Sequence, residues 1–372
     1  MELEIKQNIL NKALNIVSRV AGGGGALSGP YLPILNNILI RVKDKKVSLT
    51  ATNLEIAVVE YVEAEKLTEG EITVPAKLLT DFVGNLPKDE NVKIIKNENK
   101  VVVKAGRYSS TLNTMNSEDF PELPEIDEDK AIKFIMGVEQ LKEAIGSVII
   151  ACSNNTTRPV LTGVCFNTFQ GDLYLVATDG YRLAEKKFIK DIKSELKAVV
   201  PANSLQEVLR SLSDDVDEVE ILINEAQARF RIGEIEITSK LIDGSYVDYR
   251  GLIPKENKIN ARIERLEMQR VVKLAASFAK TTGGAINCET KADEGVLTVA
   301  AVANEMGENN SEIEVDVEES AKITINSKFL LDVLNVLGGD EVLFSFSDKI
   351  APLVIKDAEK DDYVYIVMPQ YG

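Results

Sequence analysis

The sequence predicts an α+β protein made of three tandem copies of one unit, each with few helices and many antiparallel strands. Two observations predict this fold. A helical pattern recurs at a fixed spacing along the chain, and stretches in which apolar and polar residues alternate lie between the helices. A length of 372 residues suits two or three domains, and hydrophobic residues, at 45%, are numerous enough to form several cores.

The recurring helix has the same apolar face in each copy. Its three occurrences are residues 73–87, 199–213 and 324–338, which align at steps of 126 and 125 residues. Leu79, Leu205 and Leu330 occupy one equivalent position on that face. A second motif precedes the helix in the same register: LTATNLEIAV at 49–58, LVATDGYRLA at 175–184 and, more weakly, AAVANEMG at 300–307. Two features repeated in register favour tandem domains.

Strands are predicted where the apolar period is two. Residues 91–106, 219–241 and 341–369 alternate in this way and are interrupted by Asn, Asp or Gly, which is typical of antiparallel hairpins. The acidic, proline-bearing stretch 119–130 and residues 252–260 are the predicted boundaries. The resulting domains are 1–125, 126–254 and 255–372.

Two further helices carry basic residues on a face of their own. In residues 8–20, Lys12, Asn15 and Arg19 lie apart from the apolar face, and in residues 266–280 a second stripe contains Arg270, Lys273, Ser277 and Lys280. Such stripes are commonly solvated surface. The net charge of the chain is −16, however, so clustered basic residues are an asymmetry that a weak, non-specific contact with phosphates would explain.

Composition narrows the classes of function. The chain has no histidine, which excludes Ser-His-Asp triads, histidine metal sites and histidine general bases. Cys152, Cys165 and Cys288 are scattered, as expected of reduced thiols in a cytoplasmic protein. No apolar run reaches the roughly 18–20 residues that cross a bilayer, and no signal-peptide pattern opens the sequence. We therefore expect a cytoplasmic protein with no membrane partner.

Three local motifs have simple structural interpretations. The glycine run AGGGGALSG at 21–29 lacks the GK[ST] of a phosphate loop and follows a helix, so it is predicted to be a connector. The acidic run IDEDK at 126–130 lacks calcium-loop spacing and is predicted to be a solvated linker. ATDGYR at 177–182 is predicted to be a hairpin corner.

Motifs along essentially the whole chain resemble the beta sliding clamp family of bacterial DNA polymerase III. They are YLPILNNILI (31–40), VSLTATNLEI (47–56), TVPA (73–76), DFPELP (119–124), VATDGYRLA (176–184), ITSKLIDGSYVDYRGLIP (237–254), LLDVLNVL (330–337) and YVYIVMPQYG (363–372). The resemblance implies three copies of the DNA clamp fold per chain and a head-to-tail dimeric ring, with helices lining the channel and antiparallel sheets outside. It further implies a non-enzymatic processivity factor without cofactor or metal, which encircles duplex DNA and is opened by an ATP-driven loader.

The resemblance also implies a pocket for a short peptide motif carried by the polymerase III catalytic subunit, the clamp loader and other proteins. Carried over by position, its residues are Leu161, Thr178, Gly180, Tyr181, Arg182, Leu183, Leu252, Asn326, Phe329, Ile350, Pro352, Ile366, Val367, Met368 and Pro369. Tyr181, Val247 and Gly251 depart from the commonest residues of the family at their positions.

Two other surfaces complete these expectations. The DNA-facing residues are predicted to be Lys12, Arg19, Arg158, Arg270, Lys273 and Lys280. The dimer interface is predicted to pair a basic edge strand with an acidic one and to include Lys100, Lys104, Arg107, Phe278, Glu305 and Glu308, with Glu312 and Glu314 nearby. Two alternatives belong to other classes: a nucleotide-acting cytoplasmic enzyme, disfavoured by the missing GK[ST] and the repeat, and a cytoplasmic protein-interaction scaffold that does not encircle DNA.

Overall fold

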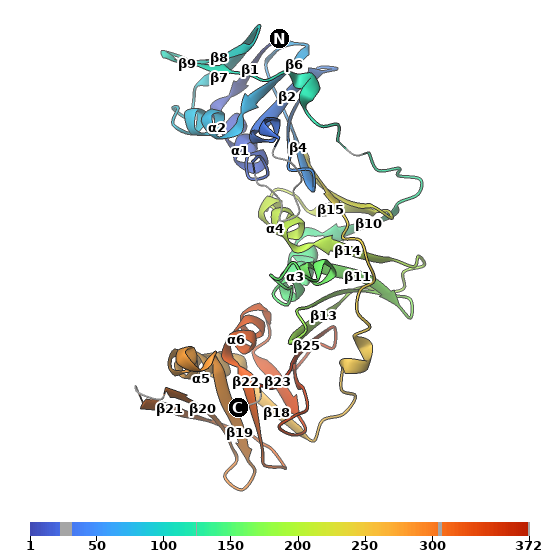
Figure 1. Ribbon diagram of the computed structural model, residues 1–372, viewed down its shortest axis with the longest axis vertical. Helices are drawn as coiled ribbons and strands as arrows, with labels where there is room; N and C mark the ends of the chain where they lie inside the picture. The colour runs from blue at the N-terminus through green and yellow to red at the C-terminus, as the bar shows by residue number, and fades with distance from the viewer. Residues whose placement is uncertain (23–31, 124, 304–306, 371–372) are drawn as a thin grey trace. The chain divides into compact units, whose positions relative to one another are not determined.

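The computed structural model describes residues 1–22, 32–123, 125–303 and 307–370, apart from the side chain of Lys66 (Figure 1). The chain forms two compact units, and each contains two separate stretches of sequence. The first unit comprises Met1–Val138 and Asn203–Leu241, and the second comprises Glu139–Ala202 and Ile242–Gly372.

The first unit contains two antiparallel sheets with helices packed on them. The smaller sheet has the order β5 (Lys66–Thr68), β1 (Glu2–Lys6), β7 (Asn91–Asn97), β8 (Lys100–Ala105) and β9 (Tyr108–Asn113). The larger has the order β10 (Ile132–Gly137), β15 (Glu218–Ile223), β16 (Gln227–Ile232), β17 (Ile235–Lys240), β4 (Ile56–Val62), β3 (Lys46–Thr52), β2 (Asn37–Lys43) and β6 (Gly70–Pro75). The helices are α1 (Gln7–Val17), α2 (Ala76–Gly84) and α4 (Ala202–Ser211), with short 3₁₀ turns η1 (Pro33–Asn36) and η2 (Ser117–Asp119).

The second unit repeats this plan. Its larger sheet has the order β14 (Lys197–Pro201), β11 (Gly163–Phe169), β12 (Asp172–Thr178), β13 (Arg182–Ile189), β25 (Tyr363–Val367), β24 (Leu353–Asp357), β23 (Glu341–Phe346) and β18 (Ile259–Glu264). The smaller has the order β21 (Gly307–Glu314), β20 (Val296–Ala303), β19 (Ala285–Lys291) and β22 (Ala321–Asn326). The helices are α3 (Val138–Ile149), α5 (Arg265–Phe278) and α6 (Ser327–Val336), with 3₁₀ turns η3 (Pro159–Thr162), η4 (Arg250–Leu252) and η5 (Ala279–Thr282).

Each larger sheet joins strands that are far apart in sequence. In the first unit β4 pairs with β17, with Glu60 opposite Ile235. In the second unit β13 pairs with β25, with Leu183 opposite Ile366. Backbone hydrogen bonds therefore make one continuous sheet from two sequence repeats, and no connecting segment is needed to hold the repeats together at these seams.

The repeated helices predicted from the sequence are confirmed. They are α2, α4 and α6, and a strand leads directly into each of them. The equivalent residues Leu79, Leu205 and Leu330 are fully buried, because the shared apolar face packs on the core. The helix α5 packs on the core through four buried residues, Met268, Val271, Val272 and Ala275, and Ala279, just beyond its end, is also buried.

Two sequence predictions are wrong in detail. The helix predicted at 8–20 ends at Val17, which leaves Arg19 in the turn that follows it. Lys100 and Lys104 do not lie on an edge strand, because β8 is hydrogen-bonded to both β7 and β9. The edge is β9, whose serines and threonines give a weaker strand pattern than the valines of β8.

Some predictions concern residues outside the described part of the chain. These are Glu305 at the expected dimer interface and most of the glycine run at 21–29. None of the helices in the described residues combines the length and apolar character needed to cross a bilayer. The three cysteines are unpaired, and burial raises the pKa of each thiol to about 12.

Candidate functional site

The turn between β12 and β13 is fixed by its own side chains. Gly180 has φ +92°, a backbone conformation that favours glycine. The hydroxyl of Thr178 donates to the carbonyl of Arg182 at 2.6 Å, and the Asp179 carboxylate accepts from the backbone N–H groups of Tyr181 and Arg182 at 2.9 and 3.0 Å. This confirms the predicted hairpin corner. The turn leaves the Tyr181 ring exposed at its tip, with 68% of the residue accessible.

Arg182 ties this turn to the helix α6 and to strand β25. Its Nε donates to Asp179 at 3.1 Å, and its Nη1 lies 2.5 Å from an Asp332 carboxylate oxygen and 3.2 Å from the Tyr365 hydroxyl. The guanidinium also stacks over the Phe329 ring, 4.4 Å from its centroid. The residue is only 8% exposed, so its charge depends on these partners. Arg182 therefore fixes the position of Tyr181 relative to α6.

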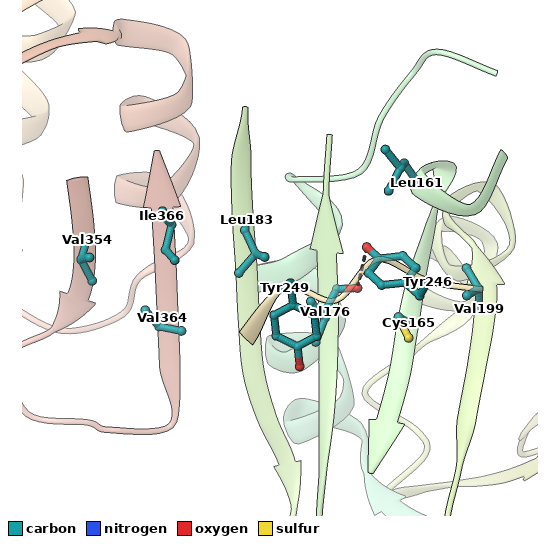
Figure 2. Close-up of a cluster of buried hydrophobic side chains, with 10 residues drawn as sticks. All are labelled: Leu161, Cys165, Val176, Leu183, Val199, Tyr246, Tyr249, Val354, Val364 and Ile366. Carbon is teal, nitrogen blue, oxygen red and sulfur yellow. Dashed lines mark hydrogen bonds between the residues drawn. The ribbon is translucent and has the colours of Figure 1, made fainter. Parts of the chain in front are cut away.

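A buried apolar cluster lies beside this turn, where β13 meets β25. The N–H of Met368 donates to the carbonyl of Tyr181 at 2.8 Å, which carries the pairing one step beyond β25. Figure 2 shows the cluster spread over the strands of the larger sheet. Its members are Leu161, Cys165, Val176, Leu183, Val199, Tyr246, Tyr249, Val354, Val364 and Ile366.

The segment that follows residue 241 covers part of this cluster. Tyr246 and Tyr249 are 5% and 3% exposed, and Figure 2 shows both rings against the strands β11 to β13. The Tyr246 hydroxyl donates to the carbonyl of Val176 at 3.5 Å. Burial raises the pKa of both tyrosines, so their hydroxyls are neutral.

Large apolar side chains are exposed around the buried cluster. We call this set the binding surface: Tyr181 (68% exposed), Leu252 (58%), Ile350 (57%), Val247 (41%) and Met368 (40%). They come from the β12–β13 turn, η4, the β23–β24 connection, the covering segment and the residue after β25. Exposed apolar groups gathered beside a packed, preformed floor are typical of a site that binds an apolar partner.

The remaining predicted peptide-site residues all belong to the second unit but contribute differently. Asn326 caps α6, accepting from the N–H of Lys328 at 2.9 Å. Leu161, Leu183 and Ile366 belong to the buried cluster, Val367 and Pro369 are also buried, and Phe329 and Pro352 are half-buried.

Two structural partners were not anticipated from the sequence. Asp332 and Tyr365 hold Arg182, and nothing in their local pattern indicates this. The period-two alternation in 363–367 does place Tyr363, Tyr365 and Val367 on one face of the strand, but it does not identify Arg182 as the partner of Tyr365.

The predicted DNA-facing residues differ in how exposed their side chains are and in whether an acidic residue pairs with them. Lys273 and Lys280 are exposed, as is Arg158, while Arg270 pairs with Glu267 of the same helix. Lys12 is 3.7 Å from Asp215 and 62% exposed. Arg19 is bound to Glu207 at 2.8 Å and to Ser211 at 3.1 Å. Its charge is largely neutralised by the helix α4.

The helix α5 carries a feature that its basic stripe did not suggest. Leu266 and Leu274 are 51% and 50% exposed on it, and Val302 of β20 is 49% exposed. The neighbouring edge strand β21 bears Glu308, Glu312 and Glu314, as the sequence predicted for the acidic edge. Phe278, at the end of α5, is half-buried, and Arg107 lies in the turn between β8 and the opposite edge strand β9. Both edges have unpaired backbone groups within the described residues of this single chain.

The fold and the site together define a class of protein: a clamp-like chain of three repeated α+β copies with an apolar surface beside the seam between β13 and β25. Models of the DNA polymerase III beta subunit match the N-terminal domain at residues 1–124, the central domain at 136–248 and the C-terminal domain at 250–371. The chain belongs to this family, the bacterial beta sliding clamps, which act in DNA replication.

Individual relatives agree along the full length. The chain is 32% identical to the beta sliding clamp of Pseudomonas aeruginosa over 99% of both proteins, and 29% identical to that of Staphylococcus aureus over 91% of this chain and 92% of the relative. The crystal structure of the DNA polymerase III subunit beta from P. aeruginosa covers 100% of both chains with 32% identity and a TM-score of 0.92. A second P. aeruginosa clamp structure, bound to griselimycin, is equally similar, with 31% identity, a TM-score of 0.92 and 100% coverage of both chains.

Proposed function

We propose that two copies of this chain close head to tail into a ring around duplex DNA, pairing β9 of one copy with β21 of the other. The observation that carries the proposal is that β9 and β21 are each an edge strand of the smaller sheet in their unit. An unpaired edge is stabilised by pairing with another strand. Arg107 lies beside one edge and Glu308, Glu312 and Glu314 lie on the other, so opposite charges favour this pairing over pairing of like edges.

The DNA contact in this proposal is electrostatic and non-specific. The exposed cations are Lys273 on α5, Lys280 on η5 and Lys12 on α1, and Arg158 and Arg270 add to them. The chain as a whole has a net charge of −16, so these cations contrast with an acidic background. Binding by such contacts weakens as salt rises, so retention on DNA would depend on encirclement.

The second part of the proposal concerns partners. The binding surface and its buried floor suit a short extended peptide with leucine and phenylalanine anchors. The proposed partners are the polymerase III catalytic subunit, the clamp loader and other proteins that carry this motif. The proposed sequence repeats are residues 1–125, 126–254 and 255–372, the location is the cytoplasm, and no cofactor takes part.

The test combines mass in solution with retention on DNA. A dimer has twice the monomer mass of 40.9 kDa. After loading, the ring should stay on closed circular DNA through a high-salt wash and slide off the same DNA once it is linearised. A protein that stays monomeric at micromolar concentration, or that leaves circular and linear DNA equally fast, would refute encirclement and favour a scaffold that does not enclose DNA.

A further inference from the structure

Arg250 holds the segment that covers the apolar cluster, in addition to the buried rings of Tyr246 and Tyr249. Arg250 begins η4, one residue after the buried Tyr249 and two before the exposed Leu252. The N–H of Leu252 donates to the carbonyl of Tyr249 at 2.9 Å. Arg250 and Leu252 therefore belong to the same short turn, and the position of Arg250 affects where Leu252 lies on the binding surface.

The Arg250 guanidinium is held by both stacking and charge. Its central carbon lies 3.9 Å from the Phe169 ring centroid and 4.4 Å from that of Tyr174, on strands β11 and β12. Its Nη2 lies 3.0 Å from a carboxylate oxygen of Glu185 on β13, a residue only 7% exposed. A planar guanidinium suits this arrangement, because its faces can stack on the rings while its charge lies beside a carboxylate, whereas an ammonium group has no face to stack.

The covering segment borders an open cleft beside Arg250. Arg250, Ile253, Pro254 and Lys255 line an open cleft of about 450 Å³, and Ile253 also packs against the buried cluster. The cleft is also lined by Phe169, Tyr174 and Glu185, the three residues that hold the guanidinium. The contacts of Arg250 with these three residues, here called the clasp, therefore hold the side of η4 that borders open space, and they add to the packing of Tyr249 and Ile253.

We propose that Arg250 is a positioning residue for partner binding: its clasp on Phe169, Tyr174 and Glu185 holds η4 in place, so that Leu252 forms a preorganised wall of the binding surface. The inference rests on the proposed peptide site. Without the clasp, a partner must order the segment as it binds, and that cost lowers affinity. Arg250 itself need not touch the partner.

The experiment measures binding of a fluorescent clamp-motif peptide with leucine and phenylalanine anchors to the full-length protein. The variants are Arg250→Lys, Leu252→Ala and the double variant, and the control is Lys255→Ala, which alters the same cleft without the clasp. We expect Arg250→Lys to raise Kd by about five- to tenfold, the range of a modest coupling free energy, and Lys255→Ala to leave it unchanged. Since Arg250 acts through Leu252, the double variant should bind about as weakly as the weaker single variant.

Amide hydrogen exchange supplies a readout that does not depend on the peptide. The N–H of Leu252 should exchange faster in Arg250→Lys, while the unfolding midpoint of the protein stays close to that of the unchanged chain. Unaltered exchange at Leu252 together with unaltered Kd would overturn the inference, as would losses in Kd that simply add in the double variant. If the unchanged protein does not bind the peptide at all, the peptide site itself is refuted.

Discussion

Truncation of Met368 to alanine tests the binding surface most directly. The side chain follows β25 and is 40% exposed, while its N–H, which pairs with Tyr181, is kept in the variant. Complete burial of a methionine side chain contributes about 1.5–3 kcal/mol. If the partner covers the exposed 40%, the loss is about 0.6–1.2 kcal/mol, or roughly three- to eightfold in Kd.

The chain provides a matched control. Met115 is 39% exposed in the first unit, and its recorded hydrogen bonds, to Thr73, involve only its backbone, so Met115→Ala removes the same amount of accessible side chain elsewhere. Fluorescence anisotropy with the clamp-motif peptide compares both variants with the unchanged protein. Met368→Ala should bind more weakly and Met115→Ala should not. Equal affinities for Met368→Ala and the unchanged protein would show that the partner does not cover this residue.

Deletion of residues 368–372 is a poorer test, because two backbone hydrogen bonds go with it. Met368 donates to the Tyr181 carbonyl and Gln370 to the Thr324 carbonyl, both at 2.8 Å, and Pro369 is buried. The deletion would thus weaken the sheet as well as the site. The point substitution separates the two effects.

Three other predictions concern charge. Burial raises the pKa of Glu60 from 4.5 to about 7, although Lys12 and Arg19 act in the opposite direction. Between these two pH values the folded state keeps a proton that the unfolded state has released. The contribution of Glu60 to stability is therefore fully present below pH 4.5 and is lost as the pH rises to 7. Glu60→Gln should therefore raise the free energy of unfolding at pH 8 by up to about 3 kcal/mol and have little effect at pH 4, and urea titrations that show an equal effect at both pH values would contradict this. Arg182→Ala leaves the Asp179 and Asp332 carboxylates without their cation, so we expect a loss of about 3 kcal/mol in urea unfolding, with Arg182→Lys recovering part of it; no loss in the alanine variant would show that the network contributes nothing. Reversal of Arg270 and Lys273 to glutamate should reduce the slope of log K against log salt, measured for direct DNA binding, by about 2. If DNA contacts α5, the control Lys322→Glu on β22 should leave this slope unchanged. An unchanged slope in the double reversal would place the DNA contact elsewhere.

Local periodicity was sufficient to predict the repeat and its helices. Leu79, Leu205 and Leu330 are buried because the apolar face they share must pack on a sheet, and that requirement is visible in the spacing alone. The strand β9 was less predictable. Its residues Tyr-Ser-Ser-Thr-Leu-Asn have one buried position, Leu112, so the sequence pattern favours the more strongly apolar β8 as the edge strand.

The candidate site could be predicted only in part, because its geometry depends on pairings across the chain. The Asp-Gly turn at 179–180 is a local signal. That Arg182 meets Asp332 and Tyr365 depends on the pairing of β13 with β25, residues about 180 positions apart, which no local pattern specifies. The ion pair of Arg19 with Glu207 is likewise long-range, and it removes a charge that the helical pattern alone assigned to the surface.

The pairing of β13 with β25 also determines when the site can form during synthesis of the chain. During synthesis the turn at Asp179 and the cluster residues of β11 and β12 leave the ribosome long before residues 363–367, which complete the sheet. Domains generally fold as units as the chain emerges, but here the second unit must wait for its last strand. Until then Leu183 has no Ile366 beside it and Arg182 has no Tyr365. A nascent or prematurely terminated chain would therefore lack the complete surface proposed to bind partners.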